Sequence, residues 1–161
     1  MGSDVFVSGL GFAFFAGAMA VMRFAGDSVR NRLGAVQTLR ISGFLGAAGM
    51  MGGALAPYDW VALTSFALAG LGVANMVPIL FSAAGNHPRL TAASAISIVT
   101  MVGYSGILVA PSSIGFLAEA AGFRPTYAGL SLLLIVVALL ATRAADADEM
   151  RRQTQAGAQA A

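Results

Sequence analysis

The feature that most constrains this chain is a series of five long stretches without a charged side chain or a histidine. They hold 18, 18, 27, 29 and 18 residues, at positions 5–22, 41–58, 60–86, 90–118 and 125–142. A helix of about 20 residues crosses the hydrocarbon layer of a bilayer, which is about 30 Å thick. Only 10% of the 161 residues are charged, whereas a soluble domain carries about 25%. The sequence therefore predicts an all-α polytopic membrane bundle of five transmembrane helices, and disfavours a soluble helical bundle.

Charges and turn residues set the limits of the predicted spans. We expect transmembrane helices at residues 5–22, 33–56, 60–84, 91–120 and 126–142, within a transmembrane bundle that occupies residues 1–143. The basic stretch at residues 23–34, RFAGDSVRNRLG, is predicted to be a short loop between the first two spans. Residues 144–161 are rich in Ala, Gln, Asp and Arg and are predicted to form a cytoplasmic tail of frayed helix or disorder.

The distribution of arginine predicts the orientation. The nine basic residues are all arginine; eight fall on one side of the predicted bundle and only Arg124 falls on the other. Because cytoplasmic loops carry an excess of basic residues, we expect an integral protein of the cell (inner) membrane, with its N-terminus outside and its C-terminus in the cytoplasm. The net charge of +2 is too small to indicate a nucleic-acid partner.

The third span carries polar residues at membrane depth. Pro78 lacks a backbone N–H and is expected to kink the helix near Asn75. Thr64, Asn75 and Ser82 are separated by nearly whole numbers of helical turns and so share a face. That face either hydrogen-bonds to a neighbouring helix or lines an aqueous path.

The second and fourth spans carry patterns of small residues and helix breakers. The second contains Gly43, Gly46, Gly49, Gly52 and Gly53, which favour close helix packing over a sliding surface. The fourth carries a polar stripe of Ser94, Ser97, Thr100 and Tyr104. It is then expected to be interrupted, at a moving or binding segment, by Gly103, Gly106 and Pro111.

No pattern for catalysis, metal binding or nucleotide binding accompanies these spans. The chain has no cysteine, and His87 is its only histidine, so the usual ligands of a metal site are missing. It also lacks the GxxxxGK[ST] loop that cradles nucleotide phosphates. We therefore expect no enzyme activity and no cofactor.

Three segments resemble the C-terminal half of major facilitator superfamily (MFS) transporters. The basic stretch is similar to the signature between helices eight and nine in its Gly26, Asp27, Arg30, Arg32 and Gly34. Arg23 and Ser28 depart from the ideal motif, in place of a glycine and an arginine. Residues 70–86, GLGVANMVPILFSAAGN, resemble helix ten of sugar-permease-like members, and residues 103–124, GYSGILVAPSSIGFLAEAAGFR, resemble helix eleven.

This resemblance implies a function and a set of partners. The five spans would be helices eight to twelve, with helices one to seven absent, and Asp27 would brace helix five of that absent part. Transport of a small polar solute, with a sugar as first candidate, would proceed by alternating access in the lipid bilayer. The implied cavity residues are Asn75, Thr100 and Tyr104. The implied gating residues are Pro78, Gly103, Gly106 and Pro111. A non-transporting membrane scaffold or partner subunit is the alternative.

Overall fold

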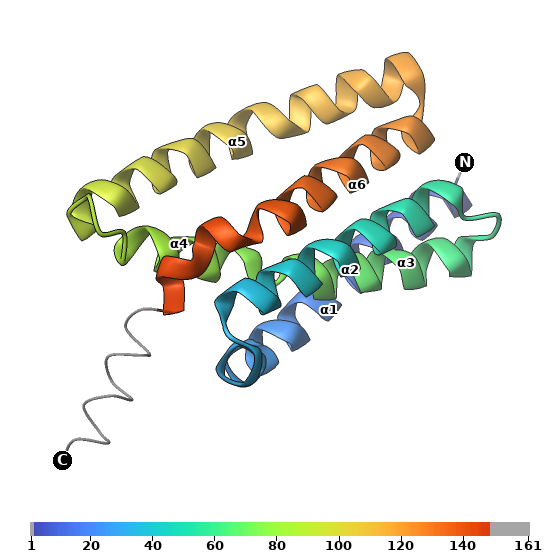
Figure 1. Ribbon diagram of the computed structural model, residues 1–161. Helices are drawn as coiled ribbons and strands as arrows, with labels where there is room; N and C mark the ends of the chain where they lie inside the picture. The colour runs from blue at the N-terminus through green and yellow to red at the C-terminus, as the bar shows by residue number, and fades with distance from the viewer. Residues whose placement is uncertain (1, 149–161) are drawn as a thin grey trace.

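The computed structural model describes residues 2–148, and within that range all regular secondary structure is helical, without a strand (Figure 1). The elements are α1 (Gly2–Leu33), α2 (Ala35–Leu55), α3 (Asp59–Val73), α4 (Met76–Gly85), α5 (Ala92–Ala121), α6 (Phe123–Leu139) and the 3₁₀ helix η1 (Leu140–Asp148). The predicted all-α class is confirmed.

Within residues 2–148, four segments are long and apolar enough to cross a membrane. They are Gly9–Leu33, Asp59–Gly85, Ala92–Ala121 and Phe123–Ala145, and they correspond to the first, third, fourth and fifth predicted spans. The second predicted span forms α2, a helix of 21 residues. Its many glycines and Arg40 lower its mean hydropathy, so its crossing of the membrane stays a prediction.

The prediction of a loop at residues 23–34 is wrong, because α1 continues without a break to Leu33. Arg30 and Arg32 lie in the last turn of α1, where positive charge suits the negative end of the helix dipole. The chain turns only at Gly34, whose φ of 80° falls in the left-handed region that glycine adopts readily. The signature therefore lies mainly on one face of a helix end.

The glycines of α2 allow it to pack closely on two neighbours. A Cβ added to Gly49 would lie 2.6 Å from the carbonyl oxygen of Ser65 in α3. On the side of α6, a Cβ added to Gly43 would lie 2.7 Å from the Cβ of Ala138. The structure thus shows the close packing that the glycine pattern favours.

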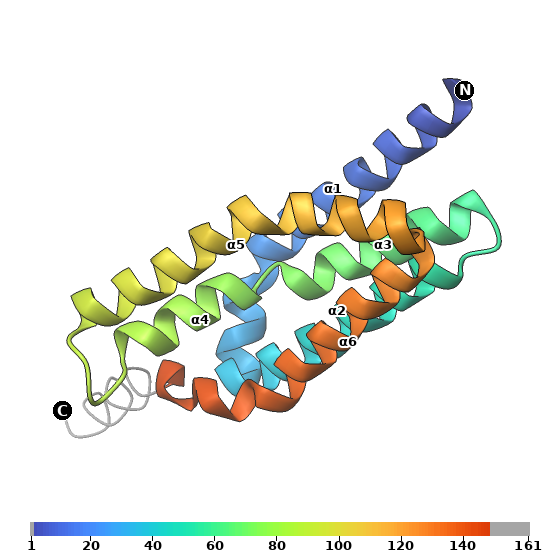
Figure 2. The same cartoon turned by 90° about the horizontal axis from the view of Figure 1, so that it is seen from above.

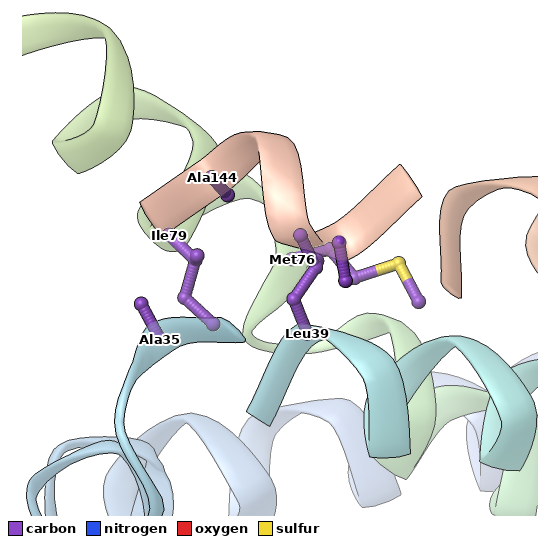
Figure 3. Close-up of a cluster of buried hydrophobic side chains, with 6 residues drawn as sticks. Ala35, Leu39, Met76, Ile79 and Ala144 are labelled. Carbon is purple, nitrogen blue, oxygen red and sulfur yellow. The ribbon is translucent and has the colours of Figure 1, made fainter. Parts of the chain in front are cut away.

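One end of the bundle holds a small apolar core (Figure 3). Its members come from α2, α4 and η1: Ala35, Leu39, Met76, Ile79, Ala141 and Ala144. Residues 144–148, at the start of the predicted tail, belong to η1, and Ala144 is buried. They therefore follow the helical alternative for this segment, and η1 contacts α2 and α4. Residues 149–161 lie outside the described residues.

Helix α5 stands apart from the first three helices (Figure 1). Among the described residues it contacts only α4 and α6, its neighbours along the chain, and it buries only Ala95 and Ala118. The expected interruption is absent, since α5 is one helix of 30 residues with Pro111 inside it. Proline inside a membrane helix is tolerated where local adjustments satisfy the freed carbonyl group.

Candidate functional site

A polar cavity of about 340 Å³ lies where α1 meets the break between α3 and α4, and we name it the junction pocket. Helix α1 contributes Arg23, Gly26, Asp27 and Arg30, whose spacing places them on one face of the helix. The other wall consists of Asn75, Val77, Pro78 and Ile79. The break between α3 and α4 is plain in Figure 2. Of the twelve residues singled out from the sequence, the structure brings five together here: Gly26, Asp27, Arg30, Asn75 and Pro78.

Asn75 and Gly26 form the contact that closes the inner side of the pocket. A Cβ on residue 26 would overlap the Asn75 side chain, so only glycine allows α1 to approach this closely. Asn75 is only 6% exposed, and its Nδ2 has no hydrogen-bond partner among the described residues. Leaving a buried polar group without a partner costs about 1–3 kcal/mol. Such a group in a native fold calls for a ligand, a water molecule or a functional role.

The backbone at the break stays close to helical. The N–H of Ala74 donates to Gly70 O at 3.2 Å, and the N–H of Ile79 donates to Asn75 O at 3.3 Å. Ala74 and Asn75 both have right-handed helical backbone angles. Pro78 has no N–H, so Ala74 O lacks the donor that a residue four positions later normally supplies.

A hydrogen bond joins α1 to α4 beside the pocket. Arg30 Nη2 donates to Ser82 Oγ at 2.8 Å. Ser82 therefore bonds to a neighbouring helix, whereas Asn75 on the same predicted face lines a cavity. Thr64 does neither: it is exposed and donates to the carbonyl oxygens of its own helix at Trp60 and Val61. The break between α3 and α4 explains this difference. Side chains on the two helices that are whole helical turns apart in the sequence no longer lie on one common face.

The remaining signature residues lie around the rim. Asp27 is exposed and has no hydrogen bond or ion pair with any residue that the structure describes. Arg32 is also exposed, and Gly34 terminates the helix. The prediction of a loop at residues 23–34 gives no reason to place Arg23 beside Gly26 and Arg30. In a helix, its position three residues before Gly26 and seven before Arg30 would have placed it on their face.

Thr100 and Tyr104 are not brought to this pocket. Both are on α5, which does not contact α1 in the described part of the chain, and Tyr104 is 64% exposed. A Cβ added to Gly103 or Gly106 would meet nothing within 4 Å. The role of these four residues, and of Pro111, in a cavity or gate stays a prediction.

A second cavity, of about 400 Å³, has a different character. It lies near the opposite end of the bundle and is lined by apolar and aromatic side chains, among them Phe12, Phe15, Leu63, Phe66 and Tyr127. The rings of Phe66 and Tyr127 meet edge to face at 5.3 Å. This cavity offers few polar groups, so the convergent polar chemistry of the bundle lies in the junction pocket.

The helices, their hydropathy and the interrupted third span define a polytopic helical membrane protein. The sequence pattern of the family described as Major Facilitator Superfamily matches residues 1–161, and the chain belongs to this family. An uncharacterized MFS-type transporter of Yersinia pestis is 37% identical over 131 residues, covering 81% of this chain and 34% of that protein.

Two rhizobial proteins resemble this chain to a comparable extent. Membrane protein MosC of Rhizobium meliloti is 39% identical over 130 residues, which are 81% of this chain and 31% of that protein. An uncharacterized transporter of Sinorhizobium fredii is 33% identical over 141 residues, which are 88% of this chain and 37% of that protein. The chain thus spans about a third of the length of these relatives. No solved structure matches the chain.

Proposed function

We propose that this chain forms helices eight to twelve of an MFS secondary transporter, which moves a small polar solute across the cell membrane by alternating access. The motif order supports this position in the C-terminal half, and the relatives named as transporters support the activity. A sugar is the first solute class to test, because residues 70–86 resemble helix ten of sugar-permease-like members. The arginine-rich end of the bundle would face the cytoplasm.

The observation that carries this proposal is the division of the third span at Asn75. A membrane helix that stops and restarts exposes backbone groups that only protein, water or a ligand can satisfy. In transporters such discontinuous helices form solute and ion sites. At this break Pro78 has no N–H to donate to Ala74 O, and Asn75 Nδ2 has no hydrogen-bond partner among the described residues.

The open surface of α5 gives the proposal its second part. Helix α5 carries a polar stripe that includes Thr100 and Tyr104. Almost all side chains of α5 are exposed. We propose that helices from the rest of the transporter pack along α5 and close a solute cavity over this stripe. Asn75 would line the same cavity, and Pro78, Gly103, Gly106 and Pro111 would gate it.

The test is solute uptake by the full-length protein in proteoliposomes, with a panel of labelled mono- and disaccharides. Tyr104→Phe removes one hydroxyl group from the predicted stripe and keeps the ring. Ser105→Ala is the matched control, because Ser105 Oγ donates to Met101 O of its own helix at 2.8 Å. Loss of one solute hydrogen bond corresponds to about tenfold weaker affinity.

We therefore expect a raised KM for Tyr104→Phe and an unchanged KM for Ser105→Ala. Equal kinetics for both variants would contradict the cavity assignment. Absence of uptake for every polar solute tested would contradict the transport proposal and favour a membrane scaffold.

A further inference from the structure

We propose that the second cavity binds an uncharged aromatic molecule of one or two fused rings, and we name this cavity the aromatic pocket. It lies near the opposite end of the bundle from the junction pocket and shares no lining residue with it. The inference therefore does not rest on the proposed transport of a polar solute.

The aromatic pocket forms where α1, α2, α3 and α6 meet. Ring and alkyl side chains make up most of its wall: Phe12, Phe15, Met50, Leu63, Phe66 and Tyr127. The other two lining residues, Gly11 and Ala62, are small, and none of the eight carries a charge. A charged ligand would lose its hydration here without gaining a partner, so the chemistry of the wall selects an uncharged one.

The ring of Phe66 is held in place by its neighbours. A Cβ added to Gly11 would lie 3.6 Å from Phe66 Cδ2, and one added to Gly53 would lie 3.3 Å from Phe66 Cζ, so α1 and α2 border this ring. Tyr127 meets it edge to face at 5.3 Å and also stacks on Phe123 at 6.2 Å. Rings that are already ordered lose little conformational freedom when a ligand binds.

The volume of the aromatic pocket suits a small ring system. A dry apolar cavity of about 150 Å³ holds one benzene molecule, and the aromatic pocket measures about 400 Å³. Cavities for small molecules are commonly about 300–1,000 Å³. One ring, or two fused rings, therefore fits between the helices.

The aromatic wall favours a ring over the acyl chain of a lipid. An acyl chain is already surrounded by apolar groups in the bilayer, so it has no hydrophobic drive to enter an apolar pocket. It would also lose the freedom of its rotatable bonds. A flat ring instead gains edge-to-face and offset-stacked contacts with Phe66 and Tyr127, which a chain cannot make.

The experiment is site-resolved photolabelling of the full-length protein, expressed from its natural gene and held in lipid nanodiscs. The probe is 3-phenyl-3-(trifluoromethyl)diazirine, which loses N₂ on illumination and leaves a carbene that inserts into nearby bonds. Naphthalene, uncharged and with two fused rings, is the competitor. Mass spectrometry of the digested protein follows the labelling of Leu63, and the naphthalene concentration that halves this labelling gives an apparent affinity.

Two variants alter the pocket, and one serves as the matched control. Gly11→Leu directs a bulky side chain toward Phe66 and Leu63. Gly9→Leu is the control, because a Cβ at residue 9 meets nothing within 4 Å and residue 9 does not line the pocket. Phe66→Leu keeps apolar bulk but removes the ring, so the test does not depend on the folding of Gly11→Leu.

We expect naphthalene to suppress the labelling of Leu63 equally in the wild type and Gly9→Leu. Gly11→Leu and Phe66→Leu should each require about tenfold more naphthalene. Equal naphthalene concentrations for all four proteins, or labelling that naphthalene does not reduce, would overturn the proposal. A fatty acid with an alkyl diazirine tests the lipid alternative: if it labels Leu63 and naphthalene does not displace it, the pocket belongs to lipid chains and the proposal is wrong.

Discussion

Replacement of Gly49 by alanine tests whether α2 and α3 are held together by direct backbone contact. The added Cβ would lie 2.6 Å from Ser65 O, which is 0.8 Å short of the 3.4 Å at which ordinary contact begins, and 2.7 Å from Ala69 Cα. Because both atoms belong to the backbone of α3, no side-chain rotation relieves the overlap. The two helices must separate, and overpacking of this kind costs about 1–3 kcal/mol.

Gly17→Ala is the matched control for this substitution. Gly17 lies in α1, and a Cβ there would meet nothing within 4 Å. Both substitutions gain the same helix propensity, about 1 kcal/mol, so this contribution cancels in the comparison. We expect Gly49→Ala to be less stable than Gly17→Ala by about 1–3 kcal/mol, measured by reversible unfolding in mixed detergent micelles. Equal stability of the two variants would refute the close packing of α2 on α3.

Three further outcomes follow from single contacts. Ser131→Ala should lower the free energy of unfolding by about 0.5–1.5 kcal/mol, because Ser131 Oγ donates across helices to Ala47 O at 2.9 Å in a buried site; the same unfolding assay measures it, and an unchanged value would contradict it. A double-mutant cycle of Arg30→Gln and Ser82→Ala should show coupling of about 1 kcal/mol, whereas additive effects would argue against the bond. Pro78→Ala restores a donor for the carbonyl one turn earlier, so hydrogen exchange at the α3–α4 break should slow; unchanged exchange would show that the break does not depend on proline.

Much of the fold could be predicted because the bilayer sets the length of each helix. The stretch at residues 60–84 was recognised from its lack of charge and corresponds to Asp59–Gly85. The prediction of a loop at residues 23–34 is wrong because charged residues do not by themselves end a helix. Arginine is a good helix former, so α1 extends beyond the apolar stretch and carries Arg23 and Arg30 on its surface. The order of residues 144–148 had no local signal, since it depends on packing against α2 and α4.

The polar residues of the site could be predicted from the sequence, but the contact between Asn75 and Gly26 could not. Asn75 was noticeable because an amide at membrane depth is costly, and Pro78 because it cannot donate a hydrogen bond. Nothing in the sequence indicated that Asn75 would meet Gly26, since that contact depends on how α1 packs against α3. Pro111 shows the converse limit: the same residue type lies within a continuous helix in α5, because a proline alone does not determine a break.

The most direct test of the proposed alternating access is the labelling of a single cysteine at Thr100 in the full-length protein. Thr100→Cys, in a cysteine-free background, would be treated with a membrane-impermeant maleimide from either face of oriented vesicles. Alternating access predicts labelling from both faces, with saturating solute changing the two rates in opposite directions. Labelling from one face only, at a rate that solute does not alter, would contradict it.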